Sequence, residues 1–274
     1  MKRVFKFIVM IAFTCVLIGL AETKVEAATS SSEVFHDNEN GILTVKYNNK
    51  DHIKMKISVT KDKKSYYYNL NDGENEIDVP LSMGNGCYTV KILKNIVDNR
   101  YSVVMKTSID LKLEDDKVVF TQSNVIVDFK LTDKSIEKAD SLTKNCKTEE
   151  EVIDTIYQFV VENFVYDYEN VKQKAATIGY IPDIEIIYQN KTGICYDISA
   201  IMAAMMRSQG ITVKLVTGYT KNIDGYHAWN SIYDSSQGSW LAVDGTYDIG
   251  MIRLKNKYSM VKKASDYVEV KYEY

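Results

Sequence analysis

The chain has 274 residues, of which 45% are hydrophobic and 26% charged, and its formal net charge is −3. This composition is typical of a globular protein and excludes general disorder, and the length fits one large domain or two modest ones. No segment is strongly basic, so the chain lacks the Lys/Arg footprint that phosphate binding needs, and nucleic acid is not an expected partner.

The N-terminal residues have the pattern of an export signal. A basic start at residues 2–6 precedes an uncharged, mostly apolar run over residues 7–20, and a small-residue stretch ends at Ala27-Ala28. This predicts a secretory signal peptide over residues 1–27. The apolar run is short for a membrane span, which disfavours an uncleaved anchor. We therefore expect a secreted, extracellular protein, with cell-surface association as an option and no stable membrane insertion after cleavage.

Residues 28–40 are mainly small, polar and acidic and predict a flexible leader. Over residues 41–132, apolar and polar residues alternate in short runs, and clusters such as Asn71-Asp72-Gly73 separate them. Short alternating strands at this spacing predict an antiparallel β-sandwich of immunoglobulin-like character. The topology of that sandwich is left open.

The pattern changes near residue 133 and predicts a second domain over residues 133–274. Thr148 and Glu151 have the spacing of a capping box, and apolar residues recur at helical spacing from Val152 to Val160. The expected fold class is therefore α+β.

Three cysteines lie beyond the predicted signal peptide, at positions 87, 146 and 195. An odd number in an exported protein indicates a free thiol. Cys87 and Cys146 either pair or are both buried small side chains, and the sequence does not decide. Because no C-x-x-C motif is present, neither a zinc site nor a redox motif is predicted, and we expect no metal or other cofactor.

Cys195 stands at a chemically favourable position. It follows Gly193, and Ile198, Ile201 and Met202 recur after it at helical spacing, with Gly210 as a natural helix end. Cys195 is therefore expected at the N-terminus of a buried helix, where the helix dipole stabilises a thiolate.

His227 and Asp244 lie on two predicted apolar strands. Histidine occurs only three times, and His227 alone would be taken as a core residue. Asp244 needs a partner, because an unpaired buried carboxylate is very costly. Neighbouring strands would bring the two side chains together, which predicts a triad. Cys195 would be the nucleophile, His227 its ion-pair partner and proton donor, and Asp244 the group that orients the imidazole.

Five motifs in the order of Cys, His and Asp carry a resemblance to a known family: residues 193–200 (GICYDISA), 210–211 (GI), 213–219 (VKLVTGY), 226–230 (YHAWN) and 240–246 (WLAVDGT). Together they resemble the core of the transglutaminase-like superfamily over about residues 148–250. The resemblance implies a papain-like fold, with the cysteine helix packed on an antiparallel sheet, and acyl transfer from an amide through a thioester. One departure is Gly245, where the family often has Pro.

An acyl-transfer site also needs an oxyanion hole. The Cys195 backbone N–H is one expected donor. Gln189 is a candidate second donor, since a Gln stands six residues before the cysteine in papain-like enzymes, and Tyr166 is another. Trp229 is a further candidate for oxyanion or substrate contact.

We expect an enzyme acting on protein or peptide substrates, with cell-wall peptide as one option. Cross-linking, deamidation and peptide cleavage all stay open. The sequence lacks an acidic calcium cluster like that of the animal cross-linking enzymes. The alternative hypothesis is a non-catalytic cell-surface or wall-associated binding protein that uses the same fold as a scaffold.

Overall fold

The computed structural model describes residues 33–37, 39–177 and 179–274. The signal peptide predicted over residues 1–27, and the first part of the predicted leader, lie outside the described residues. Within the described residues, no helix is both long and apolar enough to cross a membrane.

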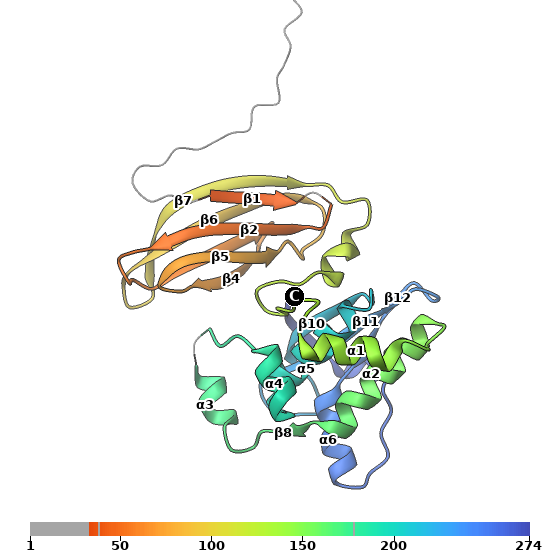
Figure 1. Cartoon of the computed structure of the whole chain (residues 1–274). Helices are drawn as coiled ribbons and strands as arrows, with labels where there is room; N and C mark the ends of the chain where they lie inside the picture. The colour runs from red at the N-terminus through yellow and green to blue at the C-terminus, as the bar shows by residue number, and fades with distance from the viewer. Residues whose placement is uncertain (1–32, 38, 178) are drawn as a thin grey trace, which may run out of the picture. The chain divides into compact units, whose positions relative to one another are not determined.

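Two antiparallel sheets make up the first part of the described chain, with strand orders β1-β2-β5 and β4-β3-β6-β7 (Figure 1). Alternate side chains such as Val45, Ile57 and Val90 are fully buried in one shared core, as sheets with one buried face require. The strands are β1 (Glu33–Asp37), β2 (Ile42–Asn49), β3 (Met55–Lys61), β4 (Lys64–Leu70), β5 (Gly73–Pro80), β6 (Gly86–Val97) and β7 (Arg100–Leu111).

Strand β1 lies in the segment that we predicted as a flexible leader. It pairs with β2 from Glu33↔Lys46 to Asp37↔Ile42. Val34 also packs against the core. Backbone pairing therefore orders this segment, because β2 offers an edge whose N–H and C=O groups need partners.

Helices and a third antiparallel sheet, of order β12-β11-β10-β13, make up the second part (Figure 1). This mixture of helices with antiparallel sheets confirms the predicted fold class. The helical elements are η1 (Asp116–Thr121), α1 (Lys134–Thr143), α2 (Glu149–Asn163), α3 (Val171–Ala176), α4 (Ile184–Asn190), α5 (Cys195–Arg207), α6 (Gly245–Arg253) and η2 (Ala264–Asp266). The strands are β8 (Val165–Tyr166), β9 (Thr192–Gly193), β10 (Val213–Tyr219), β11 (His227–Asp234), β12 (Ser239–Val243) and β13 (Glu269–Glu273).

Helix α5 is the central element of this part. Every residue from Asp197 to Arg207 is buried. The helix packs on β10 and β11, and α1, α2, α4 and α6 contact it. A helix that is apolar on all sides is stable only inside a protein, so this surrounding shell explains the continuous run of Ile, Ala and Met residues.

Arg207 ends α5 and ties three segments together. Its guanidinium donates to the backbone oxygens of Val213 (2.7 and 2.9 Å), Gln122 (2.9 Å) and Tyr274 (2.6 Å). Burial lowers the pKa of Arg207 to about 9. The carbonyl dipoles are the groups that compensate this buried charge.

The C-terminal strand β13 links the third sheet to the sandwich. It pairs with β10, while the Ser82 hydroxyl donates to the Glu273 backbone oxygen over 2.7 Å. The Glu273 backbone N–H donates to the Tyr66 hydroxyl over 3.2 Å. The two parts also share one continuous hydrophobic core. The division at residue 132 therefore stays a prediction.

Candidate active site

Cys195 is the first residue of α5 and its side chain is partly exposed. The backbone at Gly193 lies close to the Asp197 side chain, and this close approach helps to fix the start of the helix. A Cβ on Gly193 would come within 2.5 Å of the Asp197 Cβ, so only glycine fits without a shift. The position confirms the predicted helix start, where free backbone N–H groups and the helix dipole favour a thiolate.

Asp197, two residues after the cysteine, fixes this helix start. Its fully buried carboxylate accepts from the Ile194 backbone N–H (3.0 Å), the Lys174 ammonium (2.8 Å) and the Tyr180 hydroxyl (2.7 Å). Three donors satisfy the buried charge. Our sequence interpretation missed this role, although an acidic residue at the third position of a helix is a capping signal.

His227 begins β11, directly opposite Gly218 of β10, and is 2% exposed. Its Nε2 lies 2.8 Å from Asp244 Oδ2, so Nδ1 is the ring nitrogen available to interact with the Cys195 thiol. Burial opposes the imidazolium charge, but the hydrogen bonds with Asp244 and Cys195 outweigh it and raise the pKa of His227 to about 10. The imidazole is therefore protonated at neutral pH, as partner of a thiolate would be.

Asp244 differs from the prediction in one detail. It does not lie within a strand, because β12 ends at Val243 and Asp244 is the N-cap of α6. Its Oδ1 accepts from the Tyr247 backbone N–H over 3.0 Å, which fixes the plane of the carboxylate. The predicted neighbourhood holds, since β11 pairs with β12. The end of β12 and the N-cap position on α6 together direct Asp244 Oδ2 at His227.

The four other groups that we predicted for the site lie in different surroundings. Tyr166 in β8 pairs with Gly193, and burial together with the charge of Cys195 raises its pKa to about 12. Gln189 is exposed on the last turn of α4, and among the described residues it has no hydrogen bond to the triad side chains. Trp229 is 2% exposed, with its ring 5.0 Å from that of Tyr267. The Cys195 backbone N–H lies at the helix start.

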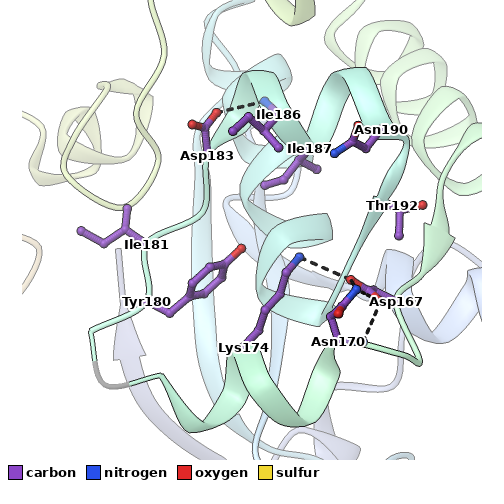
Figure 2. A pocket seen from close by; sticks show the side chains of 10 residues that line it. All are labelled: Asp167, Asn170, Lys174, Tyr180, Ile181, Asp183, Ile186, Ile187, Asn190 and Thr192. Atoms are coloured by element: carbon purple, nitrogen blue, oxygen red, sulfur yellow. Dashed lines mark hydrogen bonds and ion pairs between the residues drawn. The ribbon is translucent and has the colours of Figure 1, made fainter.

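A cavity of about 450 Å³ is lined by residues of α3, α4 and β9 and of the segments that flank α3. Lys174 and Tyr180, which both contact Asp197, are among its lining residues, and Thr192 stands three residues before the cysteine. Figure 2 shows Lys174 between Tyr180 and Asp167, with its ammonium directed at Asp167. Isoleucines line one end: Ile181, Ile186 and Ile187.

In the part of the chain that the structure describes, no group of three or more His, Cys, Asp or Glu side chains could hold a metal ion. Cys87 and Cys146 are both free thiols there, the first exposed and the second partly buried. Cys146 Sγ lies 3.6 Å from the Thr155 hydroxyl.

Residues 136–245 match the family model of the transglutaminase-like superfamily. Over this segment, the chain is similar to the transglutaminase-like core. The match spans Cys195, His227 and Asp244, and it confirms the resemblance seen in the sequence motifs. Members of such a family are typically cysteine-dependent enzymes. No curated protein matches the sequence.

Several solved structures are similar in fold. A candidate cysteine protease from Cytophaga hutchinsonii is 13% identical, with 80% of this chain and 81% of that one covered and a TM-score of 0.44. Red sea bream transglutaminase is 13% identical, with 76% and 48% covered and a TM-score of 0.35. Legionella pneumophila LapG is 15% identical, with 52% and 84% covered and a TM-score of 0.32. This chain thus spans less than half of the sea bream enzyme.

Proposed function

We propose that this protein is an exported cysteine acyltransferase or peptidase that acts on amide groups of proteins or peptides through a thioester. The observation that carries the proposal is the buried His227–Asp244 pair, whose imidazole interacts with a partly exposed thiol at a helix N-terminus. A protein that served only as a scaffold would gain nothing from a buried imidazole–carboxylate pair facing an accessible thiol.

The chemistry follows from the hydrogen bonds. The Cys195 thiolate attacks the amide carbonyl carbon, and the Sγ–C bond forms as the oxygen takes the negative charge. The C–N bond then breaks, and the proton on His227 Nδ1 passes to the leaving amine. Asp244 keeps the other ring proton on Nε2 and stabilises the imidazolium. An amine or water next loses a proton to His227, attacks the thioester and releases the thiolate.

The oxyanion hole would use the Cys195 backbone N–H and the Tyr166 phenol. The raised pKa of Tyr166, about 12, keeps its hydroxyl protonated and able to donate. Tyr226 is 53% exposed and also interacts electrostatically with Cys195. Two tyrosines near the thiol suit an extended peptide, because an aromatic face packs against backbone and methylene groups alike. Cell-wall peptide is one such substrate.

Thiol reactivity tests the proposal without knowledge of the substrate. In a Cys87→Ser, Cys146→Ser background, iodoacetamide should alkylate Cys195 rapidly near neutral pH. Alkylation should slow in His227→Ala, because the thiolate loses its ion-pair partner. Equal and slow alkylation of both proteins would contradict the proposal.

Product analysis distinguishes the outcomes. A library of glutamine-containing peptides, incubated with and without a primary amine, would reveal amine incorporation, deamidation or chain cleavage by mass. The matched control is Cys195→Ser. Products that form equally with this variant would show that the thiol is not the nucleophile.

A further inference from the structure

One side chain outside the family-matched segment reaches the triad. Tyr267 donates its hydroxyl proton to Asp244 Oδ2 over 2.9 Å. This is the same carboxylate oxygen that lies 2.8 Å from His227 Nε2. Tyr267 is 9% exposed, and its ring packs against Trp229.

The phenol can act only as a donor towards Asp244. Burial and the negative charge of Asp244 raise the pKa of Tyr267 well above its ordinary value, so the hydroxyl keeps its proton.

The residues after α6, 254–274, form a C-terminal strap that holds Tyr267 in place. The Lys262 ammonium binds the Asp248 carboxylate at 2.5 and 2.6 Å and also donates to the Ser259 backbone oxygen. The Lys221 backbone N–H donates to the Asp266 backbone oxygen over 2.8 Å. Strand β13, which follows, is paired with β10. Tyr267 therefore lies between two anchored points.

We propose that Tyr267 is a positioning residue that tunes the triad: its hydroxyl shares the Asp244 oxygen that His227 uses, and so limits how tightly Asp244 holds the imidazole proton. A hydrogen bond donated to a carboxylate stabilises the charged form and makes the oxygen a weaker base. The consequence for acyl transfer rests on the proposed function. An imidazolium held too tightly is a poor proton donor for the leaving amine.

Other titratable groups face the pair from the elements packed around it. Helix α5 contributes Cys195, α6 contributes Asp248 and the strap contributes Lys262, which neutralises Asp248. From α2, the Tyr157 hydroxyl donates to Asp248 Oδ2 over 2.7 Å. None of these changes when only the hydroxyl of Tyr267 is removed.

The test is an NMR titration of the His227 imidazole in the full chain, which has only three histidines. In Tyr267→Phe, the midpoint should move to higher pH by roughly one pH unit, the size expected for one hydrogen bond to a charged group. At pH 10, the protonated fraction of His227 should rise from roughly one half to about nine tenths. No substrate is involved, so the result does not depend on the proposed reaction.

Tyr157→Phe is the matched control, because it removes a buried phenol from Asp248 instead of Asp244. Both variants should lose stability, but only Tyr267→Phe should move the titration of His227. An unchanged or lower midpoint in Tyr267→Phe, or an equal shift in Tyr157→Phe, would overturn the proposal.

Discussion

Replacing Asp244 by Asn tests the geometry of the triad most sharply. The Asn oxygen must take the place of Oδ1, because the Tyr247 backbone N–H donates to that atom. The NH2 group then faces His227 and Tyr267, where the carboxylate had accepted two hydrogen bonds. Since two donors cannot pair, His227 is expected to carry its proton on Nδ1, towards Cys195. In this tautomer it cannot take the proton of the thiol.

The size of the loss in rate can be estimated from the pKa and the tautomer of the His227 imidazole. Its hydrogen bonds with Asp244 and Cys195 raise the pKa of His227 from 6.5 to about 10. At about 1.4 kcal/mol for each pH unit, the pairing favours the imidazolium by at most about 5 kcal/mol. The wrong tautomer alone costs about 10⁴-fold in kcat in a serine triad. We therefore expect alkylation and turnover to fall by about 10³-fold to 10⁴-fold in Asp244→Asn.

Two measurements check this prediction. The first is the rate at which iodoacetamide alkylates Cys195, followed from pH 5 to pH 10 in the Cys87→Ser, Cys146→Ser background. In Asp244→Asn this rate should stay low until the pH approaches the pKa of an ordinary cysteine thiol. Urea unfolding gives the stability. Because the pKa of His227 is raised in the folded state, its pairing stabilises the fold fully below pH 6.5, and this contribution is lost as the pH rises through about 10.

The stability advantage of the native protein over Asp244→Asn should therefore shrink between pH 7 and pH 10. An alkylation profile in Asp244→Asn that matches the native profile would refute this account of how the thiol is activated. So would a stability difference that grows as the pH rises.

Three further substitutions test other parts of the structure. Gly193→Ala places a Cβ 2.5 Å from the Asp197 Cβ, so the start of α5 must shift. We expect the free energy of unfolding in urea to fall by about 1–3 kcal/mol and Cys195 alkylation to slow. Unchanged values for both would contradict the close approach of the two residues. Arg207→Met removes the guanidinium donor from the Val213 and Gln122 carbonyls and one of two donors from the Tyr274 oxygen, so it should lower the free energy of unfolding by about 3 kcal/mol, and a loss under 1 kcal/mol would count against this role. Tyr166→Phe should lower kcat by about 10²-fold with the alkylation rate nearly unchanged, whereas an unchanged kcat would remove Tyr166 from the oxyanion hole.

Local patterns in the sequence were sufficient for much of the fold. The period-two alternation predicted the strands of the sandwich, because a sheet with one buried face needs apolar residues at every second position. The apolar run after Cys195 predicted a buried helix, and the structure places the cysteine at its first residue. These features depend on neighbours within a few positions along the chain.

The partners of the site residues depend on topology instead. Gln189 and Tyr166 were equal candidates in the sequence, but a two-residue parallel pairing of β8 with β9 brings Tyr166 next to Gly193. Gln189 is closer to Cys195 along the chain, and yet it is exposed on the last turn of α4. Separation from Cys195 along the chain therefore does not predict which of these two candidates lies nearer to the site.

The sequence by itself predicted the residue types of the proposed triad and their order, and it determined the helix that carries the thiol. Only the tertiary structure decided how Asp244 is held: as a helix cap through one oxygen, and between His227 and Tyr267 through the other. Tyr267 lies 23 residues beyond Asp244, just before β13, and the alternating pattern of residues 267–272 indicates a strand but not the partner of the Tyr267 hydroxyl. A hydrogen bond between residues this far apart exists only when the anchored segments around it are folded, which is why no local signal predicted it.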